Sequence, residues 1–124
     1  MKIVNCTPHP IHLIDATGKR SMTFPPSGQV ARVTSTAIEL PEIAPGIPAV
    51  RHEWSAVAGL PDPEEGVLYA VSTMVADRTD RTDIVVPDSG PGSVVRDANG
   101  EILGVRRFTR PRSPVVPIIE GTEV

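Results

Sequence analysis

Short runs of apolar residues, several of them alternating with polar ones, recur along the chain between Pro and Gly positions and predict β-strands. The breaks between the runs consist of turn-forming residues, as in Asp15-Ala16-Thr17-Gly18 and Pro25-Pro26-Ser27-Gly28. The first part of the chain is predicted to hold four strands, at residues 2–6, at 11–14, at a run ending near Phe24, and at 29–33.

Residues 39–66 form a Pro-rich segment with five prolines. Proline has no backbone N–H to donate to a ladder, so it is confined to sheet edges and irregular segments. We therefore expect much of this segment to be loop, with one or two edge strands near residues 38–40 and 48–54.

The most apolar run of the chain, residues 67–72, is predicted to be a central strand. Ser72 or Thr73 can cap a short helix near residues 73–78. The apolar run Ile84-Val85-Val86 has the length of a short buried strand.

The stretch Asp97-Ala98-Asn99-Gly100 is predicted to be a hairpin turn between strands at residues 94–96 and 101–108. Asn-Gly tolerates the positive φ angles that a type I′ turn requires at both central positions. From Pro111 onward the chain has three prolines and two acids, and we expect this tail to fray unless a partner holds it.

Strands at this spacing, with so little helical pattern, predict a mainly β fold: a small barrel or sandwich of short antiparallel strands with one short helix near residues 73–78. We expect a single domain over residues 1–110, followed by the Pro-rich C-terminal tail, residues 111–124. Small β domains leave sheet edges open to pairing, so a homo-oligomer is expected.

Composition and charge limit the kinds of molecule that this protein can bind. The net charge of −3 disfavours broad binding to long nucleic acid, although seven of the ten arginines lie in the last 47 residues. Only four residues are aromatic, which weakens any mode of recognition by base stacking. The single cysteine, Cys6, excludes an intrachain disulfide. The N-terminus has no signal-peptide pattern and no run is long enough to cross a membrane, so we expect a cytoplasmic protein.

The segment Asn5-Cys6-Thr7-Pro8-His9-Pro10 is the first candidate site. Asn5, Thr7 and His9 occupy alternate positions and therefore lie on the same face of a strand. Three polar groups can thus face the same cleft. Here His9 would be a general base, with Thr7 and Asn5 positioning an oxygen atom. The alternative is a structured turn, in which Thr7 and His9 bond backbone groups orphaned by the prolines.

The second candidate site uses arginines. Arg81-x-Asp83 and Arg96-Asp97 can form a basic pocket together with Arg32, Arg106 and Arg107, and the planar guanidinium recognises phosphate in two-pronged fashion. The alternative is that these arginines are solvated, or paired with their neighbouring aspartates. A few arginines on an acidic protein suit a compact anionic ligand better than a long polyanion.

No sequence motif indicates a cofactor. The chain has no Walker loop, dinucleotide fingerprint, nucleophile elbow or zinc-protease motif. His9 and His12 are three residues apart and face opposite sides of a strand, a spacing that suits a metal ion poorly. We therefore expect neither a cofactor nor a metal.

The opening Val4-Asn5-Cys6-Thr7-Pro8-His9-Pro10-Ile11 resembles that of small proteins from tailed phages and actinobacterial prophages, which begin with Asn-Leu-Thr-Pro-His and an apolar residue. Cys6 replaces their usual Leu, which indicates a packing role at this position. Further blocks of the chain are similar to theirs in the same order: Pro25-Pro26-Ser27-Gly28 with Ala31-Arg32-Val33, Gly59-Leu60-Pro61, Leu68-Tyr69-Ala70-Val71-Ser72, Arg81-x-Asp83, and Val95-Arg96-Asp97 followed by Gly100.

The resemblance implies a bacterial host cell and, by analogy of context, a protein that binds a small cyclic or ADP-ribose-type nucleotide immune signal. Arg32, Arg81 and Arg96 would hold phosphate, while Asn5, Thr7 and Asp83 would bond ribose or base, with Asp97 beside them. An enzymatic version would be a metal-independent phosphodiesterase with His9 as base. The alternative function is an oligomeric structural or accessory phage protein without catalytic activity.

Overall fold

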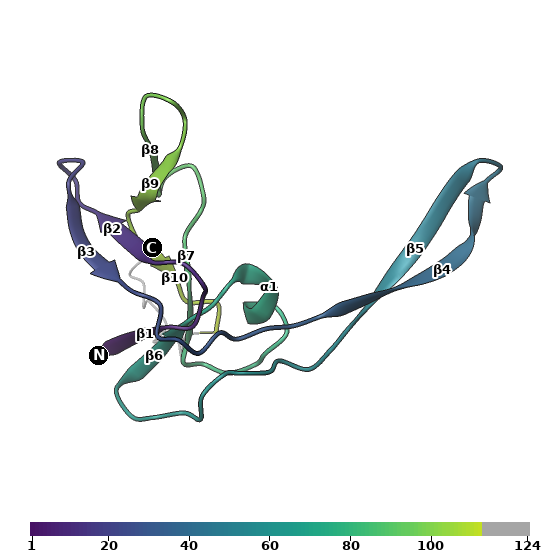
Figure 1. The fold of residues 1–124 in the computed structure, drawn as a ribbon, viewed down its shortest axis with the longest axis horizontal. Helices are drawn as coiled ribbons and strands as arrows, with labels where there is room; N and C mark the ends of the chain where they lie inside the picture. The colour runs from purple at the N-terminus through teal and green to yellow at the C-terminus, as the bar shows by residue number, and fades with distance from the viewer. Residues whose placement is uncertain (113–124) are drawn as a thin grey trace, which may run out of the picture.

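The computed structural model describes residues 1–112, which form a two-sheet body and one long projecting hairpin (Figure 1). The expected mainly β fold is confirmed. The elements in chain order are β1 (Lys2–Asn5), β2 (Ile11–Ile14), β3 (Arg20–Phe24), β4 (Ser35–Ala44), β5 (Ile47–Trp54), β6 (Val67–Ala70), α1 (Thr73–Ala76), β7 (Ile84–Pro87), β8 (Val94–Arg96), β9 (Ile102–Val105) and β10 (Phe108–Thr109).

The first sheet has the order β1-β6-β7-β10. Its central strand β6 pairs in parallel with β1 on one side and with β7 on the other, and β10 closes the sheet antiparallel to β7. All four residues of β6 are buried. A strand buried on both faces has no need of polar alternation, so the continuous apolar run at this position gives the central strand predicted from it.

The second sheet has the order β3-β2-β9-β8 and is built mainly from two antiparallel hairpins. Strands β2 and β9 join the hairpins in parallel, through Leu13 and Val105. The two strands approach closely here, since a Cβ on Gly104 would lie 2.4 Å from the His12 carbonyl oxygen. This position therefore requires glycine.

Strand β6 divides the core into two hydrophobic clusters. Tyr69 and Val71 pack with Cys6, Val75 and other side chains on one side. Leu68 and Ala70 pack on the other side in the cluster that also contains Ile11 and Val105 of the second sheet. Alternate residues of one strand thus serve both halves of the body.

Helix α1 lies where the sequence predicts it. The Ser72 hydroxyl accepts a hydrogen bond from the Val75 backbone N–H (3.3 Å), as an N-cap residue does. Val75 and Ala76 are buried, so the helix covers one side of the β6–β7 pair.

In the Pro-rich segment, the edge strands expected near residues 38–40 and 48–54 are present as parts of longer strands, and residues 55–66 are mostly loop, as expected. Strands β4 and β5 form a two-stranded antiparallel hairpin, residues 35–54, which we call the arm; it projects away from the body (Figure 1). The prolines are tolerated because both strands are edges, and Pro41 lies in a register shift between Leu40 and Ala44. Gly46, with φ of 82°, closes the turn.

Two expectations are wrong. Residues 29–33 are not a strand; Arg32 makes a single bridge to Ala58 while Ala31 packs into the core, which fixes the segment without a ladder. The turn at residues 97–100 is not type I′, because Gly100 alone of its residues has positive φ. The Asp97 carboxylate instead accepts the Asn99 and Glu101 backbone N–H groups (2.8 and 3.0 Å), which holds Asn99 at negative φ. The predicted fraying of the tail concerns residues 113–124, outside the described part.

Candidate functional site

Asn5 occupies the centre of the N-terminal motif and is 2 % exposed. Its side-chain Nδ2 donates to the carbonyl oxygens of His9 (2.8 Å) and Phe24 (2.9 Å). Its Oδ1 accepts from the Thr7 backbone N–H (2.9 Å). A buried amide whose donors and acceptor are all engaged holds the turn and the end of β3 in place, and it leaves no donor for a ligand.

Thr7 is engaged in the same turn. Its Oγ1 lies 2.7 Å from Asn5 Oδ1 and 3.0 Å from the His9 carbonyl oxygen, so its one proton bonds within the turn. This geometry agrees with the structured-turn interpretation of the motif. The His9 ring, by contrast, is exposed and has no hydrogen-bond partner within residues 1–112.

The His9 ring lies at a groove of about 280 Å³ between the N-terminal turn and β9. The groove is lined mostly by apolar side chains, and Ile102 (58 % exposed) and Leu103 (41 % exposed) form one wall. His12 also lines it, with Nδ1 2.9 Å from Thr23 Oγ1.

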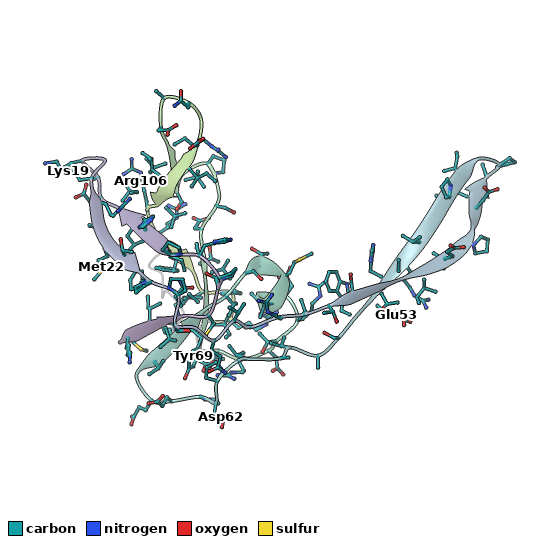
Figure 2. All side chains as sticks on the ribbon, in the orientation of Figure 1. Lys19, Met22, Glu53, Asp62, Tyr69 and Arg106 are labelled. Atoms are coloured by element: carbon teal, nitrogen blue, oxygen red, sulfur yellow. The ribbon has the colours of Figure 1, made fainter. Side chains whose placement is uncertain are left out.

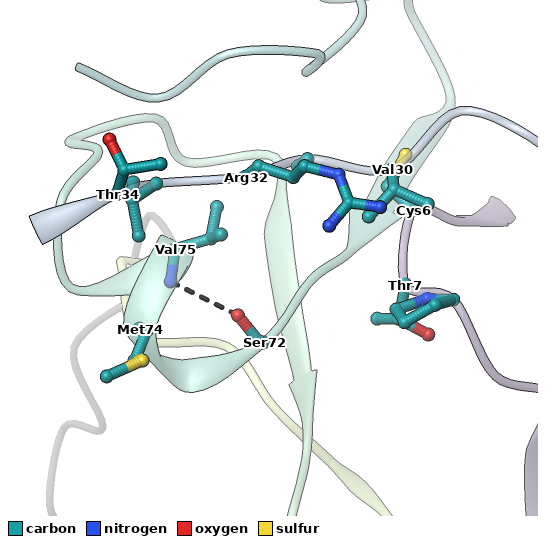
Figure 3. A pocket seen from close by; sticks show the side chains of 11 residues that line it. Cys6, Thr7, Val30, Arg32, Thr34, Ser72, Met74 and Val75 are labelled. Atoms are coloured by element: carbon teal, nitrogen blue, oxygen red, sulfur yellow. Dashed lines mark hydrogen bonds between the residues drawn. The ribbon is translucent and has the colours of Figure 1, made fainter. Parts of the chain in front are cut away.

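Arg32 lies at a different groove, of about 270 Å³, formed by the Cys6–Pro8 turn, residues 30–34 and the start of α1. Figure 3 shows the Arg32 side chain extending over the groove toward Cys6 and Thr7, opposite the Ser72 hydroxyl that caps the helix. Its guanidinium has no hydrogen-bond partner among the described residues. The groove falls just below the 300–1,000 Å³ typical of ligand pockets.

Arg81 and Asp83 form a two-pronged ion pair, with Nε–Oδ1 at 3.0 Å and Nη2–Oδ2 at 2.7 Å. The remaining Arg81 Nη1 donates to the Pro61 carbonyl oxygen (2.7 Å), and the guanidinium lies 5.5 Å from the centre of the Tyr69 ring. Tyr69 donates its hydroxyl proton to the Asp62 carbonyl oxygen (2.9 Å).

These contacts hold the 61–62 loop against the first sheet, beside the Tyr69 and Asp62 labels in Figure 2. The Arg81 guanidinium holds the pKa of the Asp83 carboxyl below its usual value, mainly through these hydrogen bonds, against the raising effect of burial. The charged groups of Arg81 and Asp83 are therefore bonded to partners in their own chain.

Arg96 and Asp97 lie at the mouth of the β8–β9 hairpin. Arg96 Nη1 donates to the Gly100 carbonyl oxygen (2.7 Å), and the Asp97 carboxylate holds the turn. The hairpin projects at the side of the body opposite Tyr69 and Asp62 (Figures 1 and 2). Hence the structure does not bring Arg96 together with Arg81.

The predicted site residues fall into four groups rather than one. Asn5, Thr7 and His9 share a turn; Arg32 lies at the groove on the other side of Thr7; Arg81 and Asp83 pair with each other; and Arg96 and Asp97 shape a hairpin. Thr7 is the one residue that lines both grooves, so Thr7, His9 and Arg32 form the nearest approach to a common site.

Most of the other arginines also bond within the chain. Arg106 and Arg112 donate to the carbonyl oxygens of Asp15 (2.6 Å) and Ala76 (2.7 Å), and Arg107 pairs with Asp88 (2.6 Å). The arginine-rich C-terminal half therefore stabilises loops and turns rather than forming a basic surface.

Cys6 is 1 % exposed and belongs to the core cluster around Tyr69. Burial raises the pKa of its thiol, only partly offset by a hydrogen bond with Ser27. A buried thiol of raised pKa is a poor nucleophile.

Sequence reasoning placed edge strands near residues 38–40 and 48–54 but did not join them into one exposed hairpin, the arm. No residue of β4 or β5 is buried within the described structure, and Leu40, Ile43, Ile47 and Val50 are exposed by 41, 74, 50 and 50 %. The signal that could have found it is the turn-forming Pro45-Gly46 between two segments that contain no proline or glycine, residues 35–40 and 49–54.

Within residues 1–112, α1 is far too short to cross a membrane, and no cluster of three or more His, Cys, Asp or Glu side chains is arranged as metal ligands. Comparisons of the chain with protein-family models, with curated proteins and with solved structures find no match.

Proposed function

We propose that this protein is an oligomeric structural or accessory component of phage type, whose arm contacts a neighbouring subunit and which breaks no bond. The observation that carries the proposal is the arm, a two-stranded ribbon of 20 residues, 35–54, that pairs with no other strand of the described body. An isolated two-stranded hairpin is marginally stable in water, and it gains stability by packing its apolar side chains on something else.

The length of the arm supports contact with another molecule. At about 3.3 Å per residue, strands of 8 to 10 residues extend roughly 26–33 Å. A compact chain of 124 residues has a radius of gyration of about 14 Å. The tip therefore reaches across a distance comparable to the width of a neighbouring body.

The polar residues of the predicted nucleotide site also favour this function. Asn5, Thr7, Arg81 and Asp83 bond one another or backbone groups of their own chain, as the residues of a scaffold do. Catalytic groups are instead left with an atom directed at the reacting molecule.

Removal of the arm tests the proposal. Ser35 and Trp54 are directly opposed, so residues 36–53 can be replaced by Asn-Gly, which closes antiparallel strands in a two-residue turn. We expect light scattering to give an oligomer for the intact chain and a monomer for the shortened one, with the same far-ultraviolet circular dichroism from the body. An intact chain that is monomeric at all concentrations, or a shortened chain of unchanged oligomeric state, would contradict the proposal.

A second candidate function is binding of a small cyclic or ADP-ribose-type nucleotide signal, supported by the Arg32 guanidinium beside Thr7, which has no hydrogen-bond partner within residues 1–112. The groove is smaller than a typical ligand pocket, so a second subunit would complete the site. In an enzymatic version His9, across Thr7, would be the base for phosphodiester cleavage.

A thermal-shift series with cyclic dinucleotides, ADP-ribose isomers and phosphate tests this candidate. We expect a shift that Arg32→Ala removes and Arg20→Ala leaves unchanged, since Arg20 is an exposed arginine distant from this groove in sequence and not among its lining residues. Chromatography of the recovered ligand then separates sequestration from cleavage, and His9→Ala must abolish any cleavage. Absence of a shift with every ligand would exclude the candidate.

A further inference from the structure

The far end of the arm is apolar on both of its faces. Residues 43–48, Ile-Ala-Pro-Gly-Ile-Pro, have no polar side chain, and we call them the tip. Ile43 is 74 % exposed and Ile47 is 50 % exposed, and the two prolines between and after them are exposed as well. Several consecutive exposed apolar residues are uncommon on a protein surface unless they take part in a contact. The tip is therefore a candidate contact surface.

The body has an exposed apolar surface of its own, the groove between the N-terminal turn and β9. Ile102 and Leu103, 58 and 41 % exposed, form one wall, and the buried side chains of Ile11 and Val105 also line it. A groove of this kind gains free energy when apolar side chains from another surface exclude water from it. It can accept a projecting apolar turn.

The tip cannot enter the groove of its own chain. Figure 1 shows the turn of the arm at one end of the long axis of the molecule, with β9 toward the other end. The Arg32 and Ala58 backbones exchange two hydrogen bonds (2.8 and 2.9 Å), which continue the ladder of the arm into the body and hold the arm outward. A tip and a groove can meet only between two molecules.

The polar groups beside the two surfaces are complementary. Glu42 directly precedes the tip, and no Lys or Arg occurs in residues 35–50. Of the described residues that line the groove, none is acidic, and the exposed His9 ring has no hydrogen-bond partner within residues 1–112. An imidazole N–H can donate to a carboxylate oxygen, so His9 is a suitable donor for Glu42 of a seated tip.

A lipid surface is the other partner that an apolar tip can have, and the residues of the arm disfavour it. Segments that bind at a membrane interface usually combine aromatic side chains with Lys or Arg nearby. The tip has no aromatic residue, and its charged neighbour, Glu42, would be repelled by anionic headgroups. The groove of a second copy is the better match.

We propose that the tip of one copy of this chain inserts into the groove of a second copy, with Ile43 and Ile47 packed against the wall formed by Ile102 and Leu103. The inference rests on the proposed function and names the surface that receives the arm. Because the tip and the groove are different surfaces, the contact is heterologous. Each copy receives one tip and donates another, so the copies form a ring or an open chain.

Mixing two defective variants tests the proposal. Ile47→Asn disrupts the tip and leaves the groove intact, while Ile102→Asp disrupts the groove and leaves the tip intact. We expect each substitution alone to weaken self-association by about 10-fold or more. An equimolar mixture should form a one-to-one dimer and nothing larger, because one working tip and one working groove remain in the pair. Sedimentation velocity measures these sizes, and a mixture that associates no better than the separate variants overturns the proposal.

Two matched controls separate this contact from general surface effects. Val50 is as exposed as Ile47 (50 % each) and lies in the same strand, but outside the tip. Met22 (56 % exposed) and Ile102 (58 %) belong to the same sheet, and Met22 does not line the groove. We expect Val50→Asn and Met22→Asp to weaken association less than about threefold, as surface substitutions outside a contact do. Control variants as defective as the test variants would overturn the proposal.

Failure of this inference can be told apart from failure of the proposed function. If the intact chain is oligomeric and removal of the arm gives a monomer, but Ile102→Asp changes nothing, the arm binds elsewhere and only the inference is overturned. An intact chain that is monomeric at all concentrations overturns both. If that monomer floats with phosphatidylcholine vesicles and Ile47→Asn does not, the partner of the tip is a lipid surface instead.

Discussion

The body and the arm are both made of β-strands, yet they differ in how far their apolar side chains are exposed to solvent. In the body, Tyr69, Val71, Val75, Ile84 and Val85 are at most 2 % exposed. In the arm, Ile43 is 74 % exposed and no residue of either strand is buried. The body is thus stabilised by its own core, while the arm depends on cross-strand pairs and on what packs against it.

This difference separates folding from assembly. Substitutions in the body should change the free energy of unfolding, because each removes contacts that one chain makes with itself. Substitutions in the arm should leave that quantity almost unchanged and alter association instead. Four measurements test the separation.

The largest effect on folding is expected from Ile84→Ala, which leaves a cavity between β6 and α1 and should lower the free energy of unfolding by about 3–4 kcal/mol. The same substitution in the arm, Ile43→Ala, should change it by less than about 0.5 kcal/mol. Urea denaturation at low protein concentration measures both. A comparable loss for the two variants would mean that the arm folds as part of the body.

Asn5→Ala should lower the free energy of unfolding by about 2–3 kcal/mol, because it removes the two bonds that the buried amide donates to the His9 and Phe24 carbonyl oxygens and the bond that it accepts from the Thr7 backbone N–H. Thr7→Val removes only the hydroxyl of the same turn and should cost about 1 kcal/mol. Denaturation curves give the values. A neutral Asn5→Ala would show that the turn does not require the bonds of this amide, and its role in ligand binding would then need testing.

A double-mutant cycle of Arg81→Met and Asp83→Asn should give a coupling of about 2 kcal/mol at pH 7, as charge-assisted hydrogen bonds do. The pKa of Asp83 is lowered in the folded protein, below the ordinary value of 3.8. The stabilisation is therefore complete above about pH 5 and is lost as the pH falls through the lowered pKa of the folded state. A coupling that persists after Asp83 is protonated would contradict this assignment.

Among the variants outside the arm, the smallest loss of stability is expected at the junction of the two regions. Arg78 lies 3.6 Å from the centre of the Trp54 ring at the base of the arm, and its Nη1 donates to the Met74 carbonyl oxygen (3.1 Å). Arg78→Ala should lower the free energy of unfolding by about 0.5–1 kcal/mol. It should also shift the fluorescence of Trp54, which is the single tryptophan of the chain. The matched control, Arg20→Ala, should change neither.

Local pattern predicted much of the body. The strand at residues 11–14, the strand predicted over 67–72 and the short helix after it follow from neighbouring residues alone. The structure confirms them, ends the second strand at Ala70 and selects Ser72 over Thr73 as the cap. The two edge strands near residues 38–40 and 48–54 were predicted, but their pairing into the arm was missed because Pro41, Pro45 and Pro48 indicate loop when judged locally. A two-stranded ribbon with both edges free accommodates them, and that freedom depends on the absence of neighbouring strands.

In the candidate site, too, local pattern was not enough to predict the contacts of the polar residues. The sequence left open whether Asn5, Thr7 and His9 line a cleft or build a turn, and whether Arg81 pairs with Asp83 or holds a ligand. The distant partners in these bonds, the carbonyl oxygens of Phe24 and Pro61, lie 19 and 20 residues away, and no local pattern indicates them.

The sequence by itself determined the class of fold, the places of most strands and turns, and the resources available for recognition: arginines, a few histidines and little aromatic surface. These properties depend on residue type and on neighbours a few positions apart. Only the tertiary structure decided which strands pair, which arginines bond carbonyl oxygens of their own chain, and which apolar residues remain uncovered. Those outcomes depend on contacts between segments far apart in the chain, and burial is a property of the whole fold.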